Sequence, residues 1–379
     1  MDFIQVIFSR KRFFNFFFLA LKQKVETYFK KNDIKDCRQL DAFTALNTVF
    51  IFTGIVLFYY LSMYSNINVG YKILAAIGAG IFHHLMMVHS GHDVSHSCFT
   101  RYPIVWSVMG FVGGILLGIS DEIWEHRHVF GHHVFTNVSG IDPDLGIYKA
   151  SPKEELQQYR ARHIVMPGWV QKIAYFLVVS DIQIDDFYSY FRGAMEQVLI
   201  NDTGAIATMR FVGLKLAFII QRVLLPIYLG HSTYLTLFLF LITELTAGCF
   251  FGHFSQISHI VDDLEWPADT PIEEDWGEMQ VRTSCDYATD SKFWTYLSGH
   301  LNYQVCHHLF PSISPQHYEA LLPLVKETCK EYNVKYTCYE SFWECLSHHY
   351  NHLKQFEDKF DCTFAEFVGF RTPNAKTVE

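Results

Sequence analysis

Histidines gather in three short segments of this 379-residue chain, and the densest segment spans residues 124–133. Within it His128 and His132 stand four residues apart, and His133 follows directly. Side chains four residues apart share one face of a helix, so these imidazoles can point at a common position. Imidazole-rich sites bind iron, zinc or copper, whereas magnesium and calcium prefer oxygen ligands. The spacing therefore predicts a transition-metal site on a helix.

Two further segments repeat this pattern, and a separate histidine adds to it. His92 and His96 are four residues apart, whereas Gln304 precedes the adjacent pair His307 and His308. Tetrahedral zinc takes only four ligands, so eight histidines suit two metal ions, each with a position open for a small ligand. The predicted metal ligands, which together with Gln304 are also the predicted catalytic residues, are His92, His96, His128, His132, His133, His259, His307 and His308.

The composition is that of a membrane protein. The chain is 50% hydrophobic, 17% aromatic and 18% charged, whereas soluble proteins carry about 25% charged residues. The net charge of −9 falls mostly in the last third of the chain and gives no sign of nucleic-acid binding. The nine cysteines include no Cys-x-x-Cys pair. This predicts reduced thiols in a protein that faces the cytosol or lies in the membrane.

Four apolar stretches are long enough to cross a bilayer, which needs roughly 20 residues. They span residues 42–64, 71–88, 211–229 and 234–251. Short uncharged loops join them in pairs, so we expect two transmembrane hairpins. Lys and Arg crowd the N-terminal, central and C-terminal regions and avoid the hairpin tips, apart from Lys72 at the edge of the second span. The positive-inside rule therefore predicts that both termini and all the histidine segments are cytosolic.

The apolar stretch at residues 104–119 is different, because it is shorter than a span and lies between two histidine segments. If it crossed the membrane, those segments would lie on opposite sides and could not share metals. We therefore predict a re-entrant or interfacial segment. Residues 142–202 carry many charges, which indicates cytosolic helices and loops.

Two basic residues, Lys215 and Arg222, lie inside the third predicted span. A charge within the membrane is costly unless it is paired. Arg222 stands eight residues before Gly230, and Glu244 stands ten residues after Tyr234, so we expect the two charges at similar depth. Two arrangements remain open: an intramembrane ion pair with Glu244, or a guanidinium that extends toward the interface.

The predicted fold is an all-α integral membrane domain over residues 42–316. It has four transmembrane helices in two hairpins and a cytosolic helical cap that holds the multi-histidine site for two metals. Residues 1–41 form a cytosolic N-terminal segment whose aromatic stretch at 13–21, flanked by basic residues, favours an amphipathic helix in the membrane plane. A disordered tail is the alternative. Residues 317–379 are expected to form a cytosolic helical tail.

The three histidine segments together resemble the motifs of the membrane-bound fatty acid desaturases, which are non-haem di-iron enzymes with four transmembrane helices. The resemblance extends over residues 40–350 and is most specific at residues 301–311, where Gln304 replaces a first histidine. That glutamine is typical of the front-end branch, which desaturates between an existing double bond and the carboxyl end. The resemblance implies O2-dependent desaturation of an acyl chain by two iron ions in the endoplasmic reticulum membrane.

Two features depart from the front-end pattern. In that branch, two residues usually separate the first histidine of the second segment from the histidine pair that follows. Here three residues separate His128 from His132, which leaves His126 as an alternative to His128. The sequence contains no His-Pro-Gly-Gly motif of a fused cytochrome b5 domain. We therefore expect electrons from a separate cytochrome b5 and its reductase, or from a ferredoxin-type donor. Coenzyme A, a phospholipid and a sphingolipid all remain open as the acyl carrier.

Two other functions fit parts of the pattern. A lipid hydroxylase or other oxygenase could use the same scaffold. It would add oxygen after the first hydrogen is removed, whereas a desaturase removes a second hydrogen. A zinc-dependent membrane lipid hydrolase or a receptor-like protein would have more spans, fewer ligands and bound zinc. Polar residues near the histidines are candidates to orient them through hydrogen bonds. These candidates are Asp93, Glu122, Glu125, Asp142, Asp144, Gln256, Asp262 and His300.

Overall fold

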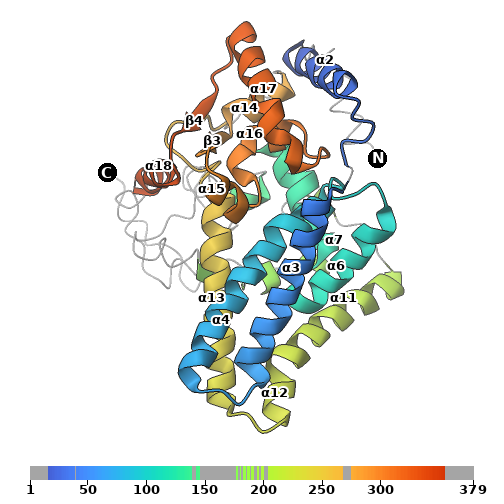
Figure 1. Cartoon of the computed structure of the whole chain (residues 1–379), viewed down its shortest axis with the longest axis vertical. Coiled ribbons are helices and arrows are strands. Elements are labelled where there is room, and N and C mark those ends of the chain that lie inside the picture. Colours follow the sequence, from blue (N-terminus) through green and yellow to red (C-terminus); the bar gives the residue numbers. More distant parts are fainter. Residues whose placement is uncertain are drawn as a thin grey trace, which may run out of the picture.

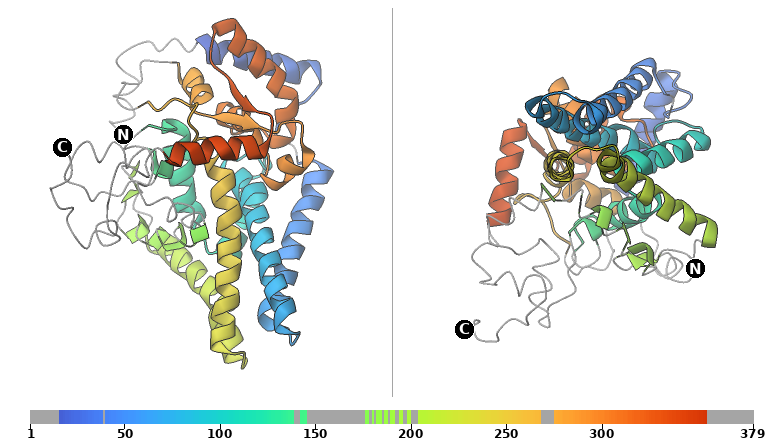
Figure 2. Two further views of the ribbon diagram at one scale, coloured as in Figure 1. Left: turned by 90° about the vertical axis from the view of Figure 1, so that its left-hand side faces the viewer. Right: turned by 90° about the horizontal axis from the view of Figure 1, so that it is seen from below.

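The computed structural model describes residues 16–38, 40–138, 142–145, 204–267 and 275–354, together with isolated positions between 176 and 199. The described part is almost entirely helical, and four of its helices are long and apolar enough to cross a membrane. These helices extend from one side of a cap that carries the C-terminal helices (Figure 1, Figure 2). The all-α membrane fold expected from the sequence is confirmed.

The first hairpin contains two membrane helices that begin at capping side chains. Asp41 accepts the N–H of Thr44, and Asn68 accepts the N–H of Gly70, so each helix begins where its free donors find a partner. Each helix continues through a π-helical turn, and the second one thereby reaches the first histidine segment. The elements are α3 (Ala42–Tyr59), η1 (Tyr60–Tyr64), α4 (Val69–Met86), η2 (Met87–Gly91) and α5 (His92–Ser95).

The second hairpin packs against the first through α4. Gly80 of α4 permits this close approach, because a Cβ there would lie 2.6 Å from the carbonyl oxygen of Thr243. All four membrane helices overlap the predicted spans, although the second and fourth continue further toward the cap and the third begins at Gly204 instead of residue 211. The elements are α11 (Gly204–Ile219), η5 (Ile220–Leu224), α12 (Leu225–Tyr228) and α13 (Thr233–Gln256), preceded in the charged central region by the short antiparallel strands β1 (Ala194–Met195) and β2 (Val198–Leu199).

A helix pair between the hairpins bends by 108°. Its first helix, α6, ends at Gly118, whose φ of +72° is the left-handed conformation that often follows a helix. The next helix begins at Ser120, whose hydroxyl accepts a backbone N–H. The bend returns the chain to the first histidine segment, although the position of this pair in a membrane stays a prediction. The elements are α6 (Pro103–Leu117), α7 (Asp121–Trp124), η3 (Glu125–His132), α8 (His133–Phe135) and η4 (Pro143–Leu145).

The cap combines C-terminal helices with one N-terminal helix. Phe17 and Leu21 of α2 are fully buried in one cluster with Tyr318 and Leu321 of α17, and the two helices lie side by side (Figure 1). Strands β3 and β4 form a parallel pair. The elements are α2 (Phe16–Lys31), α14 (Trp276–Arg282), β3 (Cys285–Tyr287), α15 (Lys292–Leu297), η6 (Leu301–Tyr303), α16 (Gln304–Leu309), η7 (Pro315–His317), α17 (Tyr318–Tyr332), β4 (Thr337–Tyr339) and α18 (Phe342–Lys354).

Both terminal regions contribute to the cap. The chain from residue 318 to 354 is built into it, so this part of the expected tail is not separate, and residues 355–379 lie outside the described ones. Helix α2 overlaps the predicted amphipathic segment, whose residues 13–15 are not described. It buries one face in the cap but leaves Phe16 and Leu19 about 60% exposed. Its position in a membrane plane stays a prediction.

Arg222 and Glu244 are both buried, and each is only 1% exposed. Arg222 donates to the carbonyl oxygen of Leu116 at 3.0 Å, whereas Glu244 accepts from the Gln183 amide at 3.0 Å. Within the described part of the chain, no hydrogen bond or direct ion pair joins the two side chains, although each still stabilises the charge of the other. The alternative is also wrong, since a side chain buried to this extent does not extend to the interface.

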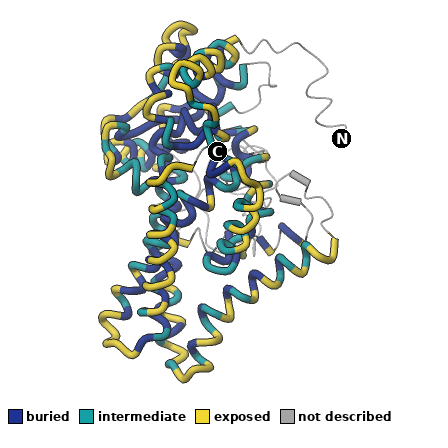
Figure 3. The backbone as a smooth tube through the Cα atoms, turned by 45° about the vertical axis from the view of Figure 1, so that its right-hand side comes forward, coloured by how far each residue is buried: buried dark blue, intermediate teal, exposed yellow. Residues whose placement is uncertain are grey.

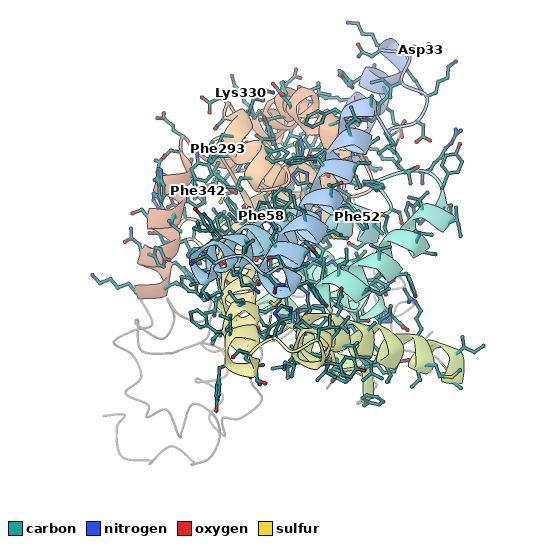
Figure 4. The ribbon with its side chains drawn as sticks, turned by 60° about the horizontal axis from the view of Figure 1, so that its bottom comes forward. Asp33, Phe52, Phe58, Phe293, Lys330 and Phe342 are labelled. Atoms are coloured by element: carbon teal, nitrogen blue, oxygen red, sulfur yellow. The ribbon has the colours of Figure 1, made fainter. Side chains whose placement is uncertain are left out.

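The membrane helices present apolar side chains outward. Exposed residues follow the outer sides of these helices, and buried ones lie where the helices meet (Figure 3). Phe52 of α3 is 43% exposed, whereas Phe58 packs against Phe82 with ring centroids 5.4 Å apart (Figure 4). An apolar surface of this extent needs a nonpolar environment, which a bilayer supplies.

Candidate metal centre

All nine residues predicted to form the site lie together where the membrane helices meet the cap. Each is buried, from His308 at 0% exposure to His128 at 7%. They come from four parts of the chain that the two hairpins and the bent helix pair bring together. These parts are α5 and the residue after it (His92, His96), η3 with α8 (His128, His132, His133), the turn after α13 (His259) and α16 (Gln304, His307, His308).

The imidazoles fall into two groups. Within each group, one ring nitrogen from every residue lies within 4.8 Å of those of the other members. The first group contains His92, His96, His128, His133 and His307, and the second group contains His132, His259 and His308. The sequence predicts sites for two metal ions. The two groups of converging nitrogens adjoin each other, because His128 of the first and His132 of the second also form a group with Asp144.

Distances in the first group test whether a metal ion fits. Nε2 of His128 lies 3.1 Å from Nε2 of His92 and 3.3 Å from Nε2 of His133, which in turn lies 3.0 Å from Nε2 of His307. Because a neutral imidazole carries a single N–H, hydrogen bonds cannot satisfy all three contacts at once. Nitrogens held about 2.0–2.1 Å from one metal ion lie about 3.0–3.4 Å apart. The residues therefore fit a bound metal.

The second histidine segment owes its geometry to the π-helical turn η3, in which an N–H bonds to the carbonyl five residues earlier. The backbone N–H of His133 donates to the carbonyl of His128, so these two side chains stand one turn apart and both enter the first group. His132 lies elsewhere on the turn and enters the second group. This turn accommodates the additional residue of the segment, and His126 belongs to neither group.

A hydrogen bond from Nδ1 orients every imidazole of the second group. A proton on Nδ1 leaves the lone pair on Nε2, which is the form that binds a metal. Nε2 of His308 is buried and has no hydrogen-bond partner among the described residues. The three bonds run from His132 to the Asp142 carboxylate (3.1 Å), from His259 to the carbonyl oxygen of Thr283 (3.1 Å) and from His308 to Oε1 of Gln280 (2.8 Å).

The first group has fewer such anchors. Nδ1 of His307 lies 3.3 Å from the Tyr318 hydroxyl, and Nδ1 of His92 lies 3.5 Å from the Asp93 carboxylate, which is a weak contact. Nδ1 of His133 is buried without a hydrogen-bond partner in the described part of the chain. The orientation of these rings therefore depends more on their packing against one another.

Burial keeps most of these imidazoles neutral. It lowers the pKa of His128 to about 3, and together with neighbouring imidazoles it holds the pKa of His308 well below 6.5. His132 differs: burial alone would lower its pKa, but the carboxylates of Asp142 and Asp144 outweigh burial and raise the pKa to about 9. Since neutral imidazole binds metals, His132 has to release a proton when a metal binds, whereas His128 and His308 do not.

Gln304 lies beside the second group. Its Nε2 is 2.7 Å from Nε2 of His259. Its Oε1 is buried and has no hydrogen-bond partner among the residues that the structure describes. An amide oxygen accepts hydrogen bonds and can act as a metal ligand, so this side chain can interact with whatever the second group binds.

Two cavities adjoin the histidines, and His92, Trp124 and Phe251 line both of them. The larger cavity, of about 420 Å³, runs along α6; apolar side chains and glycines form most of its lining, and four charged side chains also border it. The smaller one, of about 40 Å³, lies against His128 and Gln304. A largely apolar cavity that ends at a few polar groups is the usual form of a binding site for an apolar ligand.

The polar residues that the sequence suggested as hydrogen-bond partners of the histidines lie in different places. Asp142 binds His132 as expected. Asp93 and Asp144 make longer contacts with histidines of the site, at 3.5 and 3.7 Å. The others lie elsewhere: Glu122 and Glu125 line the larger cavity, Gln256 lines the smaller one, Asp262 bonds to His348, and His300 lies against His89.

The polar candidates chosen from the sequence did not include four partners of the histidines: Thr136, Gln280, Thr283 and Tyr318. Thr283 acts through its backbone carbonyl, which no side-chain pattern can reveal. Gln280 is fully buried between the buried residues Met279 and Val281 of α14. The surrounding sequence is mixed, with Glu278 and Arg282 two residues to either side, so no local signal marks Gln280.

These features define a class of protein, namely a membrane enzyme with a buried histidine metal centre beside an apolar cavity. Comparison with known proteins gives the family, because the family model described as fatty acid desaturase matches residues 68–340, which is more than half of the chain. The chain belongs to the fatty acid desaturase family. It is therefore an oxidoreductase that desaturates acyl chains, and the resemblance noted from the sequence is confirmed.

Individual relatives agree with this membership. The chain is 33% identical over 355 residues to acyl-lipid (8-3)-desaturase B of Dictyostelium discoideum, which covers 89% of this chain and 74% of that protein. It is 34% identical over 353 residues to an acyl-lipid (8-3)-desaturase of Physcomitrium patens, with 89% and 71% covered. It is also 25% identical over 362 residues to sn-1 linoleoyl-lipid 6-desaturase of Synechocystis sp., with 92% and 97% covered.

Proposed function

We propose that this desaturase is of the front-end type and works with two iron ions. The observation that carries the proposal is the division of eight buried histidines into two groups, with Gln304 beside the second. One iron would be held by His92, His96, His128, His133 and His307. The other would be held by His132, His259 and His308.

The iron ions would supply, when bound, an oxidant made from O2 that is strong enough to remove hydrogen from an unactivated methylene, which no side chain can do. The side chains of the protein have other tasks. Asp142 and Gln280 keep the Nε2 atoms of two imidazoles directed toward the centre of the second group. Oε1 of Gln304 is proposed to act there as a weak ligand or as a hydrogen-bond acceptor.

The larger cavity is proposed to hold the acyl chain. Its lining includes Trp106, Met109 and Leu117 of α6, and it reaches His92 of the first group. A flexible chain confined in such a space presents one particular methylene to the metal centre, so geometry alone selects the carbon that reacts. Relatives named acyl-lipid desaturases support a chain carried by a membrane lipid, with acyl-CoA as the alternative carrier.

The cellular setting is proposed from the distribution of charge. We propose that the protein lies in the endoplasmic reticulum membrane with both termini and the metal centre in the cytosol, since Lys and Arg avoid the hairpin tips. Electrons would come from a separate cytochrome b5 and its reductase, or from a ferredoxin-type donor.

The test is expression in a host that lacks polyunsaturated fatty acids, with defined unsaturated acids supplied. Mass spectrometry then locates every new double bond. We expect a new double bond between an existing one and the carboxyl end of the chain. The product should appear in membrane lipids earlier than in acyl-CoA. A hydroxylated product would support an oxygenase instead, and a double bond on the methyl side would contradict the front-end assignment.

Metal analysis of the purified protein provides the second test. Two irons per chain are expected, because each histidine group has enough nitrogens for one ion. Stoichiometric zinc with no iron would contradict the proposal. In that case a hydrolytic zinc protein would become the better explanation.

A further inference from the structure

The end of helix α6 receives four hydrogen bonds from side chains, and three of the donors belong to the third membrane helix. The last carbonyls of a helix have no partners within the helix, and an unsatisfied carbonyl in a nonpolar environment is costly. Here the carbonyls of four successive residues, 115–118, each accept from a different side chain. The donors are Gln221 to Ile115, Arg222 to Leu116 (3.0 Å), Gln183 to Leu117 (2.7 Å) and Lys215 to Gly118 (2.5 Å).

Charge complementarity strengthens this arrangement. The C-terminal end of a helix carries a partial negative charge, which cations stabilise. Lys215 and Arg222 are 6% and 1% exposed, so little solvent weakens the interaction. Lys215 also pairs with Asp186 at 2.5 Å, and Asp186 accepts the N–H of Ser120 at 2.7 Å. The same network therefore holds the end of α6 and the start of α7.

One face of α6 forms a wall of the larger cavity. Trp106, Gly110, Gly113 and Leu117 lie on this face at helical spacing and line the cavity. A Cβ at Gly113 would meet no atom within 4 Å, which shows that this side of the helix borders open space. On another side, Gly114 packs against Leu214 of α11. The position of α6 therefore sets the shape of the cavity.

We infer that Gln183, Lys215, Gln221 and Arg222 form an intramembrane cap that sets the position of α6 and thereby selects the carbon at which the acyl chain is desaturated. These four are positioning residues, because they bond to the backbone of α6 and belong to neither histidine group. The identity of the chain in the cavity rests on the proposed function. The cap also explains why basic residues occur inside the third membrane helix.

The test compares Arg222→Met with Arg222→Lys in the host supplied with defined fatty acids. A shift of about 1 Å at a reacting centre can cost about 100-fold in rate. We therefore expect Arg222→Met to reduce conversion about 10- to 100-fold. We also expect a larger share of products whose double bond is displaced or that come from supplied acids of another chain length. Arg222→Lys keeps a cationic donor and should recover most of the original product pattern. The iron content should stay at the wild-type level in both.

Two further variants keep the test decisive. Gln221→Met leaves every charge in place and removes one hydrogen bond. It should therefore shift the double-bond positions of the products in the same direction as Arg222→Met, but to a smaller extent. This result remains informative even if the Arg222→Met protein fails to accumulate. Lys72→Met is the matched control, because Lys72 is a buried lysine of α4, 6% exposed, that is not a donor to the α6 carbonyls. It should keep the wild-type pattern.

The outcomes separate this inference from the proposed function. If the wild-type protein forms no new double bond, the proposed function fails. If it does, but Arg222→Met and Gln221→Met lower the yield with an unchanged double-bond position and chain-length profile, the cap does not select the carbon and the inference is wrong. Loss of iron from these variants would also overturn it, because the cap would then support the metal centre.

Discussion

The two histidine groups differ in size and in how firmly their imidazoles are held. The first group has five members, and the second has three. Every Nδ1 in the second group donates to a fixed acceptor, such as Asp142 or Gln280. In the first group, Tyr318 is 3.3 Å from His307, whereas Nδ1 of His133 has no hydrogen-bond partner among the described residues.

This difference shows two ways of building a metal site. Five nitrogens can hold an ion even if one ring is poorly aligned, because the other rings still define its position. Three nitrogens leave positions open for a small ligand, but each one must be correctly oriented. Damage to the second group, or to the residues that orient it, should therefore have the larger effect.

Removal of an imidazole from the second group should have the largest effect of all. His308→Ala leaves that group with two histidines, so we expect no detectable product and loss of one of the two metal ions, while the protein still accumulates. His96→Ala, in the larger group, should retain more metal than His308→Ala. Lipid analysis of the cells and metal analysis of the purified protein measure both effects.

The surface residue His348 provides the control for this experiment. It bonds to Asp262 at the edge of the cap and lies outside both groups. His348→Ala should leave product and iron content unchanged, even though His348 forms a partly exposed cluster with Asp262 and Asp263 that could bind an ion of its own. If His308→Ala still forms the desaturated product, the assignment of two metal ions is wrong.

Asp142→Asn should have the next largest effect. The amide can still accept a hydrogen bond from His132, but it lacks the charge that helps to raise the pKa of that imidazole to about 9. Loss of a partner of this kind costs about 10- to 100-fold in metal affinity or activity. Rates of product formation and metal content measure the loss. Asp144→Asn should cost less because Asp144 lies 3.7 Å from His132, and the reverse order would mean that Asp144 is the main partner.

Gln280→Leu removes the acceptor for Nδ1 of His308 and should reduce activity about tenfold. Gln280→Glu restores an acceptor oxygen at the same position. Recovery of most activity in Gln280→Glu would show that the hydrogen bond matters. Equal activity of Gln280→Leu and the wild type would contradict the idea that the second group needs each ring anchored.

Gln304→His should be milder, with less than about a tenfold loss, because imidazole can replace an amide oxygen as a metal ligand. Its product yield is to be compared with that of Gln304→Ala, which lacks any ligand atom and should lose more. If both variants match the wild type, Gln304 has no contact with bound metals or substrate.

Tyr318→Phe should have the smallest effect. It removes a hydroxyl 3.3 Å from His307 in the five-membered group, where four other imidazoles remain. We expect less than about a threefold change in product yield, below the usual cost of losing such a partner. A loss as large as that of Gln280→Leu would remove the proposed difference between the two groups.

Local features of the sequence were enough to predict the four apolar helices and to single out nine residues that the fold brings together; their catalytic and metal-binding roles stay a prediction. A helix of roughly 20 apolar residues matches the thickness of a bilayer, so the hydropathy of the sequence predicts each span without knowledge of the fold. Histidine spacing marked His92 with His96 and His307 with His308, because neighbouring turns of a helix are determined by local geometry. The chemical need to bring two of these segments together predicted that residues 104–119 do not cross the membrane, which stays a prediction, and the bend between α6 and α7 agrees with it.

Only the tertiary structure decided which histidine belongs to which group. The π-helical turn η3 places His128 and His133 in one group and His132 in the other, and simple α-helical spacing cannot predict that division. The anchoring partners also come from distant segments, as Gln280 does for His308. Arg222 likewise bonds to the backbone of α6 instead of Glu244, because a carbonyl at a helix end is a feature of folded backbone that residue types do not reveal.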